Sequence, residues 1–357
     1  MRRFFDAQLR MNVPAQSARL SSSNTIRVLI ILIGLGLFGG VLVHSDLSTV
    51  GEGIMLVGWG GVAVVLVIHA LSFLADVVLW MMAYDDIALS FRTCTRFYVV
   101  RLIGEAFNNA TPLASVGGEP IKAQLLKERY GVGYAESAVA FLLARSANLV
   151  ALVFFLAVGF LIMLADPRFS PAYRVFAGTG LSAFLLAIVL FLLMQRSRLL
   201  STSLAWCSGT RAGGRLADWQ HRLAAFEERL SERYREMPQR FFRICVIALL
   251  TWIAGIFEIQ VILTAAGDAI SLHEAWLIEA VVQLVRAAAF FIPGGLGVIE
   301  ISFVFIVAVV TGSSELGVVV AVIRRFRDLV WIAAGMLLAL PAGGASRLKE
   351  NIQGAGH

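Results

Sequence analysis

Long apolar runs recur along the chain and alternate with short polar segments. A helix that crosses the hydrocarbon core of a bilayer needs about 20 mostly apolar residues. The pattern predicts six spanning helices, at residues 26–44, 54–83, 134–165, 173–194, 241–266 and 316–341. The predicted fold class is therefore an all-α polytopic membrane protein.

Two further apolar runs, at residues 98–130 and 275–310, are interrupted near the middle. The first interruption reads PLASVGGE from Pro112 and the second reads PGGLGVIE from Pro293, and the two segments begin 181 residues apart. Non-helical backbone at membrane depth is tolerated only where it is buried in protein or lines a cavity. We therefore expect each run to form a re-entrant hairpin of two half-helices.

The distribution of Arg and Lys indicates how these elements are oriented, because basic loops are retained on the cytoplasmic side of a membrane. The N-terminal tail is basic, and residues 195–240 contain nine Arg and five acidic residues. Residues 45–53 and 267–275 contain no Arg or Lys. Both termini are therefore expected in the cytoplasm, and the two hairpins are expected to enter the membrane from opposite sides.

Opposite orientation of two similar halves is an inverted repeat, an architecture of secondary transporters that bind substrate near the bilayer midplane. We predict a first half at residues 26–165 and a second at 173–341. A further match supports the repeat. Arg145 begins the segment R-x-x-N-L-V, Arg325 begins R-x-x-D-L-V, and the two arginines lie 180 residues apart.

Composition supports the same class. Hydrophobic residues make up 59% of the chain, charged residues 15%, and the mean hydropathy is +0.80, which excludes a soluble globular protein. We expect residues 1–357 to form a single transmembrane domain in the bacterial cytoplasmic (inner) membrane. Cys94, Cys207 and Cys245 are scattered and form no disulfide or zinc pattern. No metal, other cofactor or nucleic-acid partner is expected.

The 195–240 connection has an amphipathic helical pattern, with apolar residues on one face and Arg residues on the others. Its apolar positions recur at three- or four-residue steps, namely Trp219, Leu223, Phe226, Leu230 and Tyr234. We expect it to lie on the cytoplasmic leaflet. It could act there as a non-specific interfacial spacer or as a lipid-selective element.

Ionisable residues inside the apolar runs are functional candidates, because a charge in hydrocarbon costs several kcal/mol unless it faces protein or water. The candidates for substrate binding are Glu119, Lys122, Arg145, Arg286, Glu300, Arg325 and Asp328. The candidates for ion or proton coupling are Asp76 and Glu258, with Glu119 and Glu300 as further proton carriers. If the cations converge on one cavity, they would attract a phosphate and could bind it bidentately.

Structural roles are alternatives for several of these residues. Asp328 beside Arg325, and Glu105 beside Arg101, could form buried ion pairs that fix helix register. Glu119 could instead stabilise the N-terminus of a half-helix.

Three segments resemble the flippase-like transmembrane family related to the lysylphosphatidylglycerol synthase membrane domain. They are TPLASVGGEPIKAQLL from Thr111, FFIPGGLGVIEISF from Phe290 and RRFRDLVW from Arg324. The resemblance implies a bundle of eight segments in which two re-entrant hairpins meet at a central cavity. The hairpin positions that it carries over are Pro112, Gly117, Gly118, Glu119, Pro293, Gly294, Gly295, Gly297 and Glu300, with Arg325 and Asp328 behind them.

Two-domain members of that family carry a soluble aminoacyl-transferase domain after the membrane part, and this sequence shows none, so lysyl-lipid synthesis is not expected. Stand-alone members are similar to proteins associated with hopanoid biosynthesis, and others are linked to polyprenyl-phosphate sugar carriers. The resemblance therefore implies a lipid without identifying it.

Our first hypothesis is a lipid translocase, or flippase, that moves an anionic, polyprenyl-linked or hopanoid-related lipid between leaflets. No G-x-x-x-x-G-K-[ST] motif is present, so ATP is not the expected driving force. The alternatives are an intramembrane transferase that acts on a lipid-linked substrate and a scaffold of a lipid-synthesis complex. The expected partners are membrane lipids with an anionic headgroup, and either further copies of the chain or enzymes of lipid biosynthesis.

Overall fold

The computed structural model describes residues 47–85, 87–110, 118–196, 213–236, 238–289, 292 and 295–354. Within these residues all regular structure is helical, and ten helices are present. The predicted span at 26–44 lies outside the described residues. So do four predicted site residues, namely Pro112, Gly117, Pro293 and Gly294.

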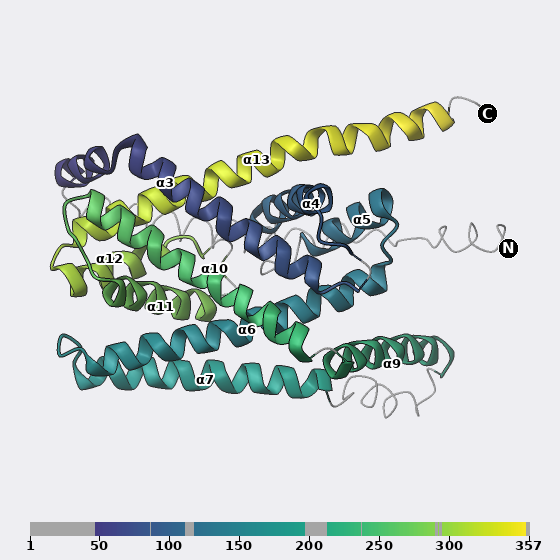
Figure 1. Cartoon of the computed structure of the whole chain (residues 1–357), viewed down its shortest axis with the longest axis horizontal. Helices are drawn as coiled ribbons and strands as arrows, with labels where there is room; N and C mark the ends of the chain where they lie inside the picture. Colours follow the sequence, from purple (N-terminus) through teal and green to yellow (C-terminus); the bar gives the residue numbers. More distant parts are fainter. Residues whose placement is uncertain are drawn as a thin grey trace, which may run out of the picture.

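Four of the described helices are long and apolar enough to cross a membrane. They are α3 (Leu47–Met82), α6 (Tyr134–Ala165), α7 (Pro171–Arg196) and α10 (Pro238–Ala265). Their bounds differ from the predicted spans by seven residues or fewer, and non-helical backbone at Gly58 interrupts α3. All four run along the length of the molecule in Figure 1.

The last predicted span, 316–341, lies within α13 (Ser314–Gly354), which has 41 residues. This helix carries Arg324, Arg325, Arg327 and Asp328 within the predicted span. Its charge content therefore separates it from the four apolar helices, and its placement in a membrane stays a prediction.

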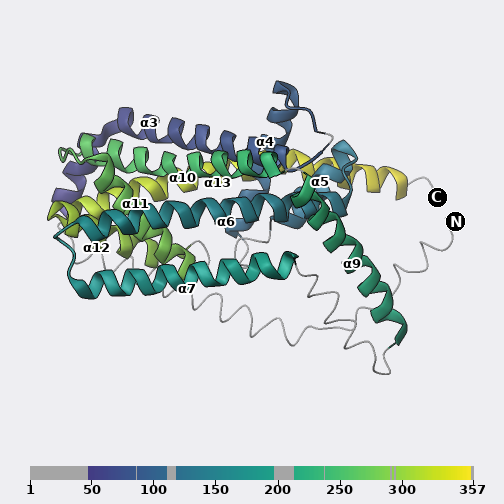
Figure 2. The ribbon, with the colours of Figure 1, turned by 60° about the horizontal axis from the view of Figure 1, so that its bottom comes forward.

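Shorter helices flank the two interrupted runs. The first run forms α4 (Phe91–Ala110) and α5 (Glu119–Tyr130), and the second forms α11 (Leu272–Ala288) and α12 (Val298–Thr311). The helices of each pair pack against each other. Figures 1 and 2 place α4 and α5 towards one end of the long axis and α11 and α12 towards the other.

The 195–240 connection contains α9 (Gly213–Glu236), which lies beyond the end of α7 in Figure 1. Its C-terminal part packs on protein, since Leu230 is buried and the Tyr234 hydroxyl donates a hydrogen bond of 3.0 Å to Gln195 Oε1. Burial raises the pKa of Tyr234 to about 12. The apolar stripe thus contacts the bundle at its C-terminal end, whereas the side chains of Trp219 and Leu223 lie outside the described residues.

Two apolar clusters form the core of the bundle. One joins α3, α6, α10, α11, α12 and α13, and includes the fully buried Phe155 and Phe303. The other joins α3, α4, α5, α6 and α10, and includes the fully buried Phe97 and Leu126. Polar side chains from the same helices lie beside the second cluster, and these build the candidate site.

Candidate functional site

A cavity of about 430 Å³ lies among side chains from seven helices, α3, α4, α5, α6, α10, α11 and α13. Six residues predicted from the sequence line it, namely Asp76, Glu119, Lys122, Arg145, Arg286 and Asp328. Further polar residues of its wall are His69, Ser72, Arg101, Glu105, Asn108, Asn148, Thr251 and Arg327. The structure therefore brings together charged residues from both predicted halves of the chain.

Three cations of the cavity wall form ion pairs with carboxylates of the same wall. Arg101 pairs with Asp76, and Lys122 pairs with Glu119. Arg327 donates to Asp328, with 2.7 Å between Nη2 and Oδ1. Pairing lowers the cost of holding these charges away from bulk water, which makes them structural parts of the wall.

Lys122 is held in place by the close packing of α5 on α4. The side chain is only 4% exposed and runs past Gly104, where any Cβ would overlap its methylene groups. The Lys122 ammonium lies 5.4 Å from the centre of the Trp80 ring, a favourable cation–π geometry. Gly118, which precedes α5, donates a backbone hydrogen bond of 2.6 Å to Asn108 Oδ1. The site therefore fixes the start of α5 and the Lys122 side chain together.

Two other cations of the wall are not paired in this way. Arg145 comes from α6 and Arg286 comes from the last turn of α11, and both side chains are exposed. Within the described residues neither guanidinium has a hydrogen bond or an ion pair. Asp328 attracts Arg286 electrostatically, but its carboxylate is bound by Arg327. The cavity thus presents two guanidinium groups that are free to bind an anion.

Aromatic rings form much of the remaining wall. Phe73 and Trp331 stack with ring centres 5.9 Å apart, and His69 lies 5.6 Å from Trp331. Trp80, Phe141 and Trp252 also line the cavity. A wall with apolar faces and a few fixed charges is typical of small-molecule binding sites.

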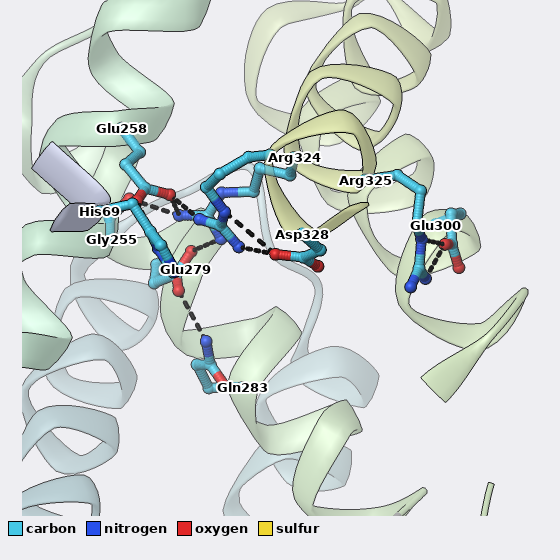
Figure 3. A network of polar contacts seen from close by, with 10 residues as sticks. His69, Gly255, Glu258, Glu279, Gln283, Glu300, Arg324, Arg325 and Asp328 are labelled. Carbon is cyan, nitrogen blue, oxygen red and sulfur yellow. Dashed lines mark hydrogen bonds and ion pairs between the residues drawn. The ribbon is translucent and has the colours of Figure 1, made fainter. Parts of the chain in front are cut away.

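A network of buried charges that includes the wall residues His69 and Arg327 joins α3, α10, α11 and α13 (Figure 3). Glu258 is 2% exposed and forms ion pairs with Arg324 and Arg327, and His69 Nδ1 lies 3.3 Å from its Oε1. Arg324 also pairs with Glu279, at 2.6 Å between Nη1 and Oε2. These partners neutralise Glu258, so its predicted coupling role would have to begin by disrupting a buried network.

Glu300 and Arg325 lie apart from that network, as Figure 3 shows, and do not line the cavity. Arg325 Nε donates to Glu300 Oε1 at 2.7 Å, and Glu300 Oε2 accepts a bond of 2.8 Å from the Gly297 backbone. Gly297 has a φ of 80°, a left-handed conformation that glycine adopts without strain. Glu300 therefore caps the start of α12 while it binds Arg325.

The remaining predicted positions are also away from the cavity wall. Gly118, Gly295 and Gly297 do not line it, and Gly295 has a φ of 60°. His69 is a wall residue that was not selected from the sequence, and Arg101 was named there only as a possible partner of Glu105. Arg101 lies in the apolar run at residues 98–130, and its charge there was the available signal, but only the fold shows that it pairs with Asp76.

Within the described residues no group of three or more His, Cys, Asp or Glu side chains could hold a metal ion. Cys94 and Cys245 are free thiols.

Comparison with known proteins identifies the relationship of the chain. The family model described as the lysylphosphatidylglycerol synthase TM region matches residues 25–335. A relative from Methanothermobacter thermautotrophicus, named a UPF0104 membrane protein, is 26% identical over 267 residues, which are 69% of this chain and 74% of the relative. No solved structure matches the chain.

Proposed function

This chain belongs to the family of the lysylphosphatidylglycerol synthase transmembrane region, a family linked to lipid handling, and is a multi-pass membrane protein. On that premise we propose that it moves a lipid with an anionic headgroup between the two leaflets of a membrane. In this proposal the headgroup occupies the 430 Å³ cavity while the acyl or prenyl chains stay in the bilayer.

The pair of unpaired arginines is the observation that carries this proposal. An uncompensated guanidinium in a membrane domain is costly, so Arg145 and Arg286 favour a site that is filled by water or by an anion. Guanidinium groups bind phosphate bidentately through parallel N–H donors. Two such groups from different predicted halves of the chain match a phosphate or phosphodiester better than a neutral headgroup.

The arrangement of the helices supports a transport mechanism. We propose that α4–α5 and α11–α12 are re-entrant hairpins of an inverted repeat, because they lie towards opposite ends of the long axis. Movement of one half against the other would expose a central site to each side in turn. We further propose a bacterial cytoplasmic membrane with both termini in the cytoplasm, since the basic segments mark that side.

A transport role without covalent chemistry is part of the proposal. The wall carboxylates Asp76, Glu119 and Asp328 are each bound by a cation, which suits a structural role better than proton transfer to a substrate. The driving force would be a lipid gradient, a coupled ion or removal of the lipid on the far side.

The test measures lipid movement in proteoliposomes that contain fluorescent phosphatidylglycerol or fluorescent phosphatidylcholine. Dithionite added outside bleaches outer-leaflet probe, so translocation appears as loss of the protected half. We expect the wild type to move the anionic probe, and R145Q and R286Q each to slow it by about tenfold or more, because each removes one charge-assisted contact.

The control is R92Q, because Arg92 is an exposed arginine at the start of α4 that does not line the cavity. Equal translocation by wild type, R145Q and R286Q would contradict the proposal. Conversion of the probe into a chemically new lipid would instead support an intramembrane transferase.

A further inference from the structure

Each predicted half of the chain contains a hairpin glutamate followed by an arginine in the next long helix. Glu119 precedes Arg145 by 26 positions, and Glu300 precedes Arg325 by 25. The two pairs correspond in the predicted repeat, but the structure treats them differently.

In the second half the pair is closed. Arg325 donates to Glu300 through both Nε and Nη2, and Glu300 is 3% exposed. The charge of Arg325 is therefore neutralised within the protein, away from the cavity wall.

In the first half the corresponding pair is open. Glu119 is bound by the Lys122 ammonium through its Oε1, and within the described residues Arg145 has neither a hydrogen bond nor an ion pair. Glu119 and Arg145 line the same cavity, and the charges of both act on Arg101 of the same wall.

One sequence difference between the two predicted halves explains why the glutamates have different partners. The position that corresponds to Lys122 in the second half, 181 residues later, is Phe303, which is buried and cannot bind Glu300. Arg325 is then the cation that compensates Glu300. Lys122 supplies an intramolecular cation only in the first half.

The packing around Lys122 fixes this arrangement. Its methylene groups occupy the space that Gly104 leaves, and its ammonium lies over the Trp80 ring. Glu119 is adjacent to it because the two residues are three positions apart on α5. The Lys122–Glu119 ion pair therefore lies within one turn of α5, and the Lys122 side chain packs against α4.

We propose that Lys122 is a positioning residue that holds Glu119 and so keeps Arg145 free to bind the anionic group of the ligand. This inference rests on the proposed function, because it assumes that Arg145 contacts the ligand. It assigns Lys122 an indirect role, whereas the sequence alone predicted direct contact with substrate.

The test measures binding of short-chain (dioctanoyl) phosphatidylglycerol to the purified full-length protein in detergent, by titration calorimetry. K122M removes the ammonium but keeps the length of the side chain. We expect about tenfold weaker binding, because Glu119 is then free to neutralise Arg145. The double variant E119Q/K122M removes the competing carboxylate as well and should bind within about twofold of the wild type.

Rescue by the double variant separates this role from direct contact, which does not predict that a second lost charge restores binding. A purely structural ion pair would also be rescued by loss of both charges, so K122M/R145Q separates that role. It should bind no more weakly than R145Q because Lys122 acts only through Arg145, whereas a structural loss would add to that of R145Q. K122R keeps the cation and should bind like the wild type. R92Q is the control, and we expect it to leave binding unchanged because Arg92 is exposed at the start of α4 and does not line the cavity.

The outcomes distinguish the inference from the function on which it rests. If R145Q weakens binding but K122M binds like the wild type, the inference is wrong and the proposed function stands. If K122M and E119Q/K122M bind the lipid equally weakly, Lys122 either contacts the ligand directly or is needed for the fold. The inference is then again wrong. If the wild type and R145Q bind the probe equally, both are wrong. Should K122M fail to give a monodisperse protein, K122Q replaces it, with about threefold weaker binding expected because the glutamine keeps a neutral hydrogen bond.

Discussion

At the scale of single residues, the state of each arginine matters more than its presence in an apolar run. Arg325 and Arg145 look equivalent in the sequence, yet Arg325 is bound by Glu300, whereas Arg145 faces the cavity with no ion-pair partner among the residues that the structure describes. A buried pair contributes little net stability, but removing one member leaves an uncompensated charge. The functional candidates are therefore the cations that the protein itself leaves unpaired.

Glu258 provides a test at this scale. E258Q should lower the free energy of unfolding by about 3 kcal/mol, because Arg324 and Arg327 would lose a shared, fully buried counter-ion. Unfolding is followed in detergent by titration with a denaturing surfactant. The matched control is E128Q, since Glu128 is exposed on α5 and accepts a hydrogen bond from Gln124 one turn earlier. A loss of transport in E258Q with no loss of stability would favour the coupling role instead.

The sequence located the charged residues of the site but not their partners. Asp76, Glu119, Lys122, Arg145, Arg286 and Asp328 were all selected because a charge in an apolar run is costly, and all six line the cavity. Which of them pair depends on contacts between helices that are distant in sequence, such as Arg101 of α4 with Asp76 of α3. Periodicity carries no information on such contacts.

At the scale of elements, the long helices were predicted well because their signal is local. Helix α6 has the predicted bounds, and the ends of α7 and α10 differ from those of the predicted spans by three residues or fewer. The short helices also begin and end beside the two Pro- and Gly-containing segments, since α4 ends at Ala110 and α5 begins at Glu119. How these helices sit in a bilayer stays a prediction.

Arg168 joins three elements at the end of the bundle that holds α12. It pairs with Asp166 after α6 and with Glu274 at the start of α11, and donates to the carbonyl of Val310 in α12. Hydrogen bonds from Arg168 lower the pKa of Asp166. Burial raises the pKa of Glu274, but hydrogen bonds from Ser271 and Arg168 outweigh it and lower that pKa overall.

These shifts predict a pH dependence of stability. Both carboxyl groups have a lower pKa in the folded state. Their contribution to stability is therefore present at pH values above their ordinary pKa, about 4, and is lost as the pH falls through the lowered pKa values. R168Q should therefore melt at a lower temperature than the wild type at about pH 7, and the difference should shrink at about pH 3. Thermal unfolding at the two pH values measures this. A difference that is the same at both would contradict the role of the ion pairs.

At the scale of the whole molecule, the helix pairs α4–α5 and α11–α12 lie towards opposite ends of the long axis, and the cavity takes charged residues from both predicted halves. The repeat in the sequence suggested two equivalent halves. In the structure the first half supplies most of the cavity wall, whereas Glu300 and Arg325 of the second half close on each other. The difference in side-chain pairing makes the two predicted halves unequal, although the sequence repeat suggests that they are similar.

In the proposed function Arg145 and Arg286 together bind the anionic group of a lipid. The most direct measurement is a cryo-EM map of the full-length protein in nanodiscs that contain phosphatidylglycerol, at a resolution that shows side chains. We expect headgroup density in contact with both guanidinium groups, and no such density for the R145Q/R286Q variant. A cavity without headgroup density, with Arg145 and Arg286 paired to protein carboxylates, would contradict it.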